Sequence, residues 1–146
     1  MDAKVEDRLA KLIIPSKALI AGELTTSASG ETFDCISPID GRVLGAIPSC
    51  DTADADRAVT AARKAFETAR WSNSHPRKRK KVLMRFAALI AEHAEELALL
   101  ETLDMGKPIR DSRSIDVPAT VSTVEWYAEA VDKIYDELAP VGPKAI

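Results

Sequence analysis

The sequence predicts a mostly helical chain that opens with a β-hairpin. Residues 74–108 carry apolar side chains at steps of three and four, which places a broad apolar stripe along a helix. A similar pattern begins at Pro118. Hydrophobic residues make up 46% of the chain but aromatic residues only 5%, a balance that favours a helical interior packed by Ala and Leu over a β-sandwich.

The first elements in chain order are short strands. Residues 19–24 (LIAGEL) are predicted as a strand, residues 25–30 as a turn rich in Ser, Thr and Gly, and residues 31–36 (ETFDCI) as the returning strand of a hairpin. The turn residues Pro, Asp and Gly at positions 38–41 precede a further strand at residues 42–47 (RVLGAI).

The first helix is expected to begin at Asp51 or Thr52 and to end near Trp71. Asp54 and Asp56 fall in its first turn, where the partial positive charge of a helix N-terminus stabilises carboxylates. The side chains expected to face inward are Val59, Ala62, Phe66 and Ala69.

The central stretch is longer than a typical globular helix, and we expect a break at residues 92–94. Ser74 stands where an N-cap would, Pro76 lies just inside the first turn, and Gly106 followed by Pro108 ends the run. The apolar stripe of this stretch consists of Val82, Leu83, Phe86, Leu89, Ile90, Leu97, Leu100 and Leu103.

The last helix is expected to start at Pro118, after a polar connection over residues 111–116. Its apolar positions are Val121, Val124, Ala128, Val131, Tyr135 and Leu138. We therefore divide the chain into a leader (residues 1–18), a body (residues 19–139) and a tail (residues 140–146).

Composition limits the classes of function. The chain has 146 residues, 20 basic and 23 acidic, with a net charge of −3, as in soluble globular domains. The N-terminus is too acidic for a transit peptide and lacks an uninterrupted apolar region, and no run reaches the about 18 apolar residues of a membrane span. We expect no membrane partner and, by default, a cytoplasmic location.

Residues that could carry chemistry are few. Cys35 and Cys50 lie too far apart for a redox pair, have no histidine at zinc-ligand spacing, and are interpreted as reduced, small hydrophobic residues. His75 and His93 sit in charged helical contexts without a catalytic partner. The Gly-Lys pair at 106–107 lacks the rest of a phosphate loop, and the dinucleotide motif is absent. We therefore expect no catalytic residue and no cofactor-binding residue in the chain.

A basic run occupies residues 77–81 (RKRKK), and it invites a nucleic-acid interpretation. However, the run begins an amphipathic helix, contains no interleaved aromatic residue and is balanced by glutamates further along. A solvated helix face is the simpler interpretation, so no nucleic-acid partner is expected.

Several segments resemble the aldehyde dehydrogenase superfamily. They are residues 54–59 (DADRAV) with 61–66 (AARKAF), Trp71, residues 97–109 (LALLETLDMGKPI) and residues 125–133 (EWYAEAVDK). The resemblance runs from about Ile20 to the C-terminus. Within the superfamily the chain looks most like the γ-glutamyl-γ-aminobutyraldehyde dehydrogenases of polyamine breakdown.

The resemblance implies an α/β parent protein that oxidises an aldehyde to a carboxylate with NAD or NADP, through a cysteine thiohemiacetal, hydride transfer and a glutamate-activated water. It places the nucleophile, the base and the cofactor-binding residues after Ile146, so the chain lacks the Rossmann sheet and is expected to be inactive alone. Residues 19–139 would be the N-terminal part of the cofactor-binding domain, and residues 140–146 the start of a connection to the oligomerisation strand. The parent is expected to be a homo-oligomer.

The resemblance also assigns Asp104 to a structural site for a monovalent cation, Na⁺ or K⁺. The backbone carbonyls of Cys35 and Ile36 would be further ligands, and oxygen ligands suit a hard cation. The last protein ligand would lie beyond the chain. The alternative is that Asp104 only caps or salt-bridges near a helix end.

A second assignment by resemblance is the mouth of the substrate channel. Asp116 matches a position where, in relatives that oxidise aminoaldehydes, an acidic residue faces the amine end of the substrate, and Ile115 and Ala119 would line the same mouth. Alternatively, Asp116 only stabilises the start of the last helix, two residues before Pro118. The two roles are compatible.

The alternative for the whole chain is a stand-alone helical module, or a remnant of an enzyme, that binds another protein through an apolar stripe. In the fragment interpretation the stripes of the long helices lack their covering partner, which predicts marginal stability or self-association. The C-terminal segment PVGPKAI, which is neither a capped helix nor a polar tail, favours the fragment.

Overall fold

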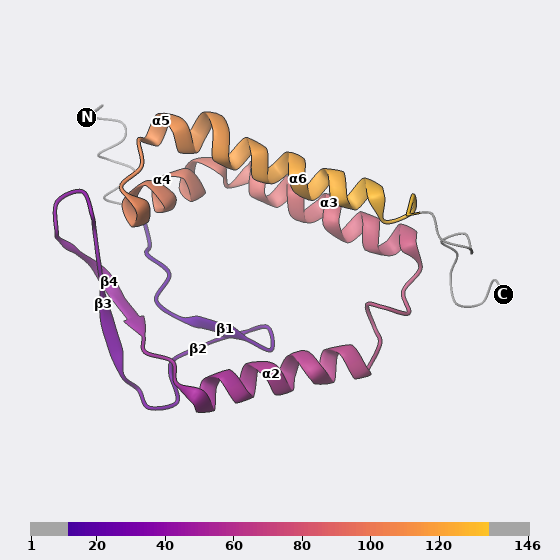
Figure 1. Cartoon of the computed structure of the whole chain (residues 1–146), viewed down its shortest axis with the longest axis horizontal. Coiled ribbons are helices and arrows are strands. Elements are labelled where there is room, and N and C mark those ends of the chain that lie inside the picture. The colour runs from indigo at the N-terminus through magenta and orange to yellow at the C-terminus, as the bar shows by residue number, and fades with distance from the viewer. Residues whose placement is uncertain (1–11, 135–146) are drawn as a thin grey trace.

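The computed structural model describes residues 12–134 and shows a mostly helical chain with two β-hairpins (Figure 1). Strands and α2 form one side of an open frame, and α3 and α6 run side by side along the other. The elements in chain order are β1 (Ala18–Ile20), β2 (Glu23–Thr25), β3 (Thr32–Ile36), β4 (Val43–Pro48), α2 (Thr52–Glu67), α3 (Pro76–Glu92), α4 (Ala94–Met105), α5 (Ile109–Asp111), the π-helix η1 (Ser112–Asp116) and α6 (Val117–Ala130).

The strands pair differently from the prediction. β1 pairs with β2, and β3 pairs with β4, both antiparallel, so the predicted pairing of residues 19–24 with 31–36 is wrong. The reason is a reversal inside LIAGEL, where Ala21 and Gly22 take positive φ angles of 56° and 85°. The predicted turn at 38–41 and the strand after it are confirmed, with Gly41 in the left-handed conformation.

α2 begins where the sequence predicts. Asp51 is the N-cap, and its carboxylate accepts hydrogen bonds from the Ala53 and Asp54 amides, while the Asp54 carboxylate accepts from the Asp51 amide. Asp54 is buried, unlike Asp56. Its two carboxylate oxygens also accept from the Ala28 amide, each at 3.0 Å, so the start of α2 is tied to the loop before β3.

The predicted break of the central stretch is confirmed, because α3 ends at Glu92 and α4 begins at Ala94. The N-cap of α3 is His75 and not Ser74: its Nδ1 accepts from the Arg77 amide at 3.2 Å. Gly106, with φ 74°, ends α4 in the left-handed conformation that glycine adopts without a Cβ penalty.

The predicted polar connection at 111–116 is wrong, since residues 109–130 form a continuous helical run that includes η1. The helical run continues through these polar residues, and their hydroxyl groups form hydrogen bonds within the run and with α4. The Ser114 hydroxyl donates to the Arg110 carbonyl at 2.8 Å, and the Ser112 and Thr102 hydroxyls lie 3.3 Å apart, joining η1 to α4.

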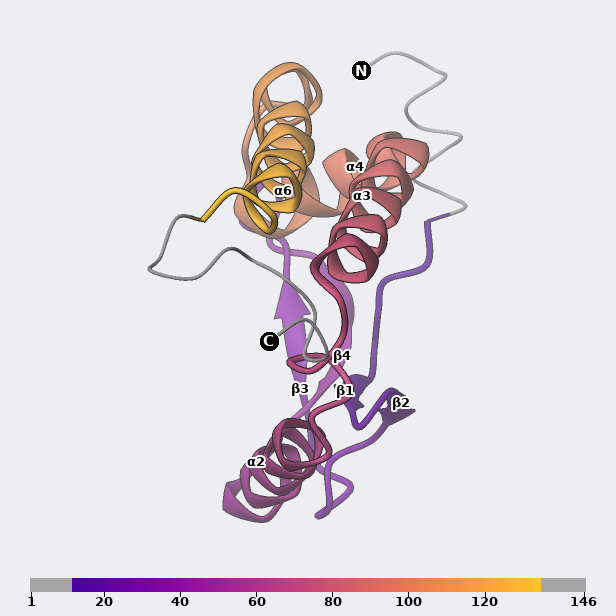
Figure 2. The ribbon, with the colours of Figure 1, turned by 90° about the vertical axis from the view of Figure 1, so that its right-hand side faces the viewer.

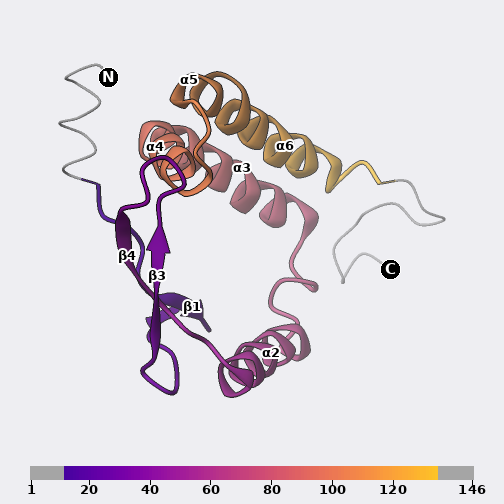
Figure 3. The ribbon, with the colours of Figure 1, turned by 60° about the vertical axis from the view of Figure 1, so that its left-hand side comes forward.

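The core lies where α4, η1, α3 and α6 meet. Its buried apolar residues are Ala87, Ala98, Leu99, Leu103, Val117 and Ala128. Ala87 and Ala128 are fully buried, and such small side chains allow α3 and α6 to lie close along their length (Figures 2 and 3).

Much of the predicted inward surface is exposed. Val59 and Phe66 of α2 are 67% and 68% exposed, and Phe86 of α3 is 53% exposed. These exposures contradict the inward placement expected of Val59 and Phe66, but they agree with the incompletely covered stripes that the fragment interpretation predicts. Periodicity indicates which residues can be covered but not what covers them. Along α6, Val121, Val124, Ala128 and Val131 are buried or half-buried, as predicted.

Some predictions lie outside the described residues. They concern most of the leader, the tail, and Tyr135 and Leu138 of the last apolar pattern. Within residues 12–134, none of the helices combines the length and the apolar character needed to cross a membrane.

Candidate functional site

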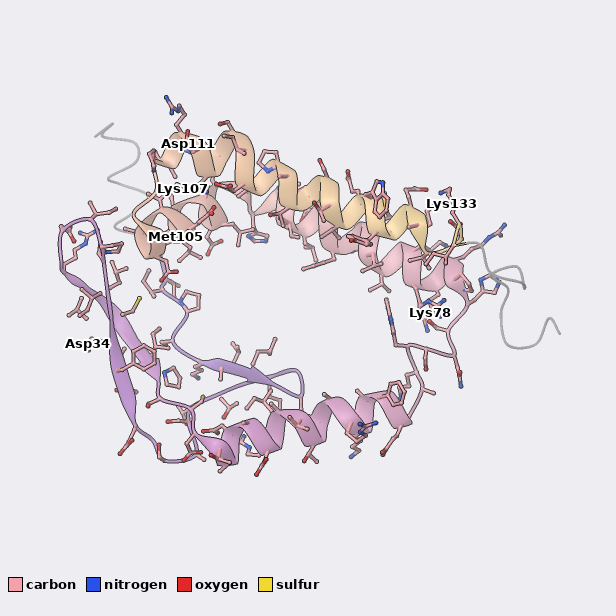
Figure 4. The ribbon with its side chains drawn as sticks, in the orientation of Figure 1. Asp34, Lys78, Met105, Lys107, Asp111 and Lys133 are labelled. Carbon is pink, nitrogen blue, oxygen red and sulfur yellow. The ribbon has the colours of Figure 1, made fainter. Side chains whose placement is uncertain are left out.

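The candidate site lies at the C-terminal end of α4, where the chain turns into α5. The turn at Gly106 packs against the loop after β3 so closely that a Cβ added at Gly106 would stand 3.1 Å from Cγ of Pro38. In Figure 4, Met105 and Lys107 lie together with Asp111 at one end of the pair of helices α3 and α6, and Lys78 and Lys133 lie at the other end. Asp104 stands two residues before Gly106, and Asp116 is joined to this turn by its ion pair with Lys107.

Asp104 lies close to β3 through the side chain of Cys35. Cys35 Sγ lies 3.9 Å from Asp104 Oδ1. Both residues line a cavity of about 440 Å³, whose walls are mostly apolar side chains of residues 14–15, β4 and α4. A β-bulge falls between Cys35 and Ile36, the two residues expected to offer carbonyl oxygens.

The fit of a cation to these residues is incomplete. Asp104 supplies one exposed carboxylate. Within the described part of the chain, no group of three or more His, Cys, Asp or Glu side chains is arranged to hold a metal ion. A hard cation would therefore depend on carbonyl oxygens and on ligands from elsewhere.

Asp116 is the last residue of η1, and its carboxylate pairs with Lys107. Lys107 Nζ lies against Asp116 Oδ2 and 3.5 Å from Glu101 Oε1 of α4. The three side chains are half-buried, at 27% to 30% exposure. The hydrogen bond to Asp116 is the main cause that raises the pKa of Lys107, against a smaller opposing effect of burial.

This pairing differs from the expected helix-start role. Asp116 lies inside the continuous helical run in an α-helical conformation and makes no capping hydrogen bond with its side chain. Ile115 is 59% exposed and Ala119 is also exposed, so both lie at the surface of the described residues.

The remaining polar candidates have structural partners or lie at the surface. Cys50 is exposed, and His93 Nδ1 lies 3.3 Å from Glu96 Oε2. In the basic run, Arg79 donates to the Ser72 and Ser74 carbonyls and Lys80 binds Glu129 of α6 at 2.7 Å, so these two side chains also make contacts within the chain.

Sequence reasoning missed Lys107 and Glu101. Both lie in the quoted LETLDMGK segment, but Lys107 and Asp116 are nine residues apart on either side of a turn. The position of Lys107 just after the glycine that ends a helix was the available signal, since cations are favoured at helix C-termini.

The described residues contain no Rossmann-type dinucleotide site. Such a site needs a parallel sheet whose strand ends meet a glycine-rich turn and a helix N-terminus. The two sheets of residues 12–134 are antiparallel hairpins.

Comparison with known proteins identifies the family. The model of the aldehyde dehydrogenase family matches residues 24–146. The aminoacetaldehyde dehydrogenase of Pseudomonas aeruginosa is 44% identical over 137 residues, which cover 94% of this chain and 28% of the relative. A P. syringae indole-3-acetaldehyde dehydrogenase variant, solved in complex with NAD⁺ and IAA, is 55% identical with a TM-score of 0.90, covering 97% of this chain and 28% of that one.

A third relative bears on the resemblance seen in the sequence. The γ-glutamyl-γ-aminobutyraldehyde dehydrogenase of Burkholderia cenocepacia is 50% identical, with a TM-score of 0.91 over 95% of this chain and 28% of its own. The fold of the chain thus matches the fold of one part of these two solved aldehyde dehydrogenases. It belongs to the aldehyde dehydrogenase family, and it spans about 28% of the length of these relatives.

Proposed function

We propose that this chain is the N-terminal part of an NAD(P)-dependent aldehyde dehydrogenase that oxidises an aminoaldehyde, as in polyamine breakdown, to a carboxylate. The main support for a dehydrogenase is the identity of 44% to 55% to aldehyde dehydrogenases over nearly the whole chain. Two of these relatives are named for aldehydes derived from amines, which supports the aminoaldehyde. The short share of those relatives that it spans supports the view that the catalytic residues belong to another part of the protein.

The chain alone is proposed to be inactive and to bind neither NAD nor NADP. The nucleophilic cysteine, the glutamate base and the cofactor-binding residues that the resemblance implies are proposed to lie outside this chain. What this part would contribute is the region around the turn after α4, where Asp116, Ile115 and Ala119 are proposed to form the mouth of the substrate channel.

The proposed role of Asp116 is to attract the ammonium end of the substrate. An opposite charge within a few ångströms stabilises a cation, more strongly where water is partly excluded. Asp116 is half-buried, and it lies beside apolar side chains that would accommodate a methylene chain. This combination supports an aminoaldehyde over a purely apolar aldehyde.

Asp104 is proposed as one ligand of a monovalent cation, with the carbonyls of Cys35 and Ile36. The proximity of Asp104 to Cys35 supports this role, while the incomplete ligand set means that the cation would bind only when further ligands are added. The cation would then act structurally, by joining the end of α4 to β3.

The complete protein is proposed to be a cytoplasmic homo-oligomer. For the chain alone, the exposed apolar side chains of α2 and α3 support self-association. The same exposure supports the alternative function, a stand-alone module that binds another protein through Val59, Phe66 and Phe86.

The test compares this chain with the polypeptide that its source makes. Each is incubated with NAD⁺ or NADP⁺ and either an aminoaldehyde or a neutral aldehyde, and formation of the reduced cofactor is followed by absorbance. We expect turnover by a longer polypeptide and none by the 146-residue chain. Turnover by neither, together with specific binding of another protein by the chain, would favour the interaction module.

A further inference from the structure

Lys107 holds the carboxylate that the proposed function assigns to the substrate amine, so the role inferred for Lys107 rests on that function. Lys107 Nζ contacts Asp116 Oδ2 and lies 3.5 Å from Glu101 Oε1. Two carboxylates thus share one ammonium group. The cluster carries a net charge of −1 instead of the −2 that the carboxylates alone would give.

The backbone that carries Lys107 has little freedom. Gly106 before it is in the left-handed conformation and packs against Pro38, and Pro108 after it has a fixed φ. On the other side, η1 is joined to α4 by the Thr102 and Ser112 hydroxyls, 3.3 Å apart. The pairing of Lys107 with Asp116 is therefore between two well-fixed chain segments.

η1 itself determines where the Asp116 carboxylate lies. One-turn π-helices inside α-helices are rare and frequently occur at functional sites, because the extra residue per turn redirects the side chains around it. Arg113 of η1 also binds Glu95 of α4 at 2.8 Å. Asp116 thus belongs to a segment held to α4, next to the exposed Ile115.

We propose that Lys107 is a specificity-determining residue, which offsets one of two carboxylates beside the exposed face of Ile115 and Ala119 and so limits how strongly that face attracts a cationic substrate. The substrate class concerned is an aldehyde with a terminal ammonium group. A neutral aldehyde of the same size has no charge for the cluster to attract.

The size of the effect can be derived from Coulomb's law. Removing one positive charge at about 6 Å from the substrate ammonium, at an effective dielectric constant of about 40 to 80, changes the affinity by roughly three- to tenfold. The change is confined to the charged substrate and shrinks at high ionic strength, because dissolved ions screen partly exposed charges.

The experiment uses the complete dehydrogenase that contains this chain and two aldehydes of equal size, 3-aminopropanal and butanal. For Lys107→Met we expect KM for 3-aminopropanal to fall about three- to tenfold, with KM for butanal and both kcat values unchanged. Lys107→Arg keeps the positive charge and should show the same ratio of the two KM values as the wild-type enzyme. Glu101→Gln should shift the ratio in the opposite direction.

The control is Lys80→Met, since Lys80 also binds a carboxylate, on Glu129, but near the start of α3 and the end of α6. It should leave the KM ratio unchanged. Equal changes in both KM values for Lys107→Met would show a merely structural role, and an unchanged ratio in both the Lys107 and Glu101 variants would also overturn the proposal. A wild-type enzyme that oxidises neither aldehyde would instead refute the proposed function.

Discussion

Replacing Asp54 by Ala should be the most damaging polar substitution at the start of α2. Asp54 is 2% exposed and accepts hydrogen bonds from the Ala28 and Asp51 amides, so it closes the capping box and attaches α2 to the loop before β3. Loss of the cap costs about 0.5–2 kcal/mol, and a buried amide left unpaired costs about 1–3 kcal/mol. The pair with half-exposed Arg57 adds little.

We therefore expect Asp54→Ala to lower the free energy of unfolding by about 2–4 kcal/mol. The measurement is urea unfolding followed by circular dichroism of the helical signal. Asp56→Ala is the matched control: Asp56 lies in the same turn but is exposed, and the change should stay within about 0.5 kcal/mol. Equal losses for the two variants would refute the buried-anchor role of Asp54.

Three further predictions concern other regions. Two lysine ammonium groups lower the pKa of Glu129 from 4.5 to about 2, first through the hydrogen bond from Lys133. The stability that Glu129 contributes through Lys80 and Lys133 should be full above pH 4.5 and lost as the pH falls toward 2. Glu129→Gln should remove this part of the pH dependence of unfolding in acid. An unchanged pH dependence in the variant would contradict the prediction. Gly106→Ala should cost about 1–3 kcal/mol in urea unfolding, because φ is 74° and the new Cβ would meet Pro38, whereas a cost near zero would show that the turn can shift. Phe66→Asp should leave stability within about 0.5 kcal/mol but reduce self-association in sedimentation experiments, and unchanged association would place the contact elsewhere.

Local signals in the sequence predicted the helices well. Asp51 before α2 and Gly106 after α4 mark their ends through chemistry that acts within a few residues, and the break near residue 93 was predicted from the length of the run. The N-cap His75 was missed because imidazole is not a usual capping group. The hairpins were paired wrongly because pairing is non-local and because Ala21 adopts a left-handed conformation that Ala rarely takes.

Features that depend on contacts between elements could not be predicted. η1 occurs where a polar stretch finds partners on α4, and the pattern of residues 111–116 alone indicates only a connection. Likewise, the resemblance indicated Asp104 and Asp116 as site residues, but only the structure brings Lys107 and Asp116 together across a turn. Periodicity identified the stripe that includes Phe86 but not the partner that would cover it.

The intact mass of the polypeptide as its source makes it, measured under denaturing conditions, tests the central claim most directly. If this chain is the N-terminal part of a dehydrogenase, the mass should be several times the 15.8 kDa of the 146 residues. A mass of 15.8 kDa would contradict that claim. The exposed apolar faces of α2 and α3 would then have to be explained by a protein partner.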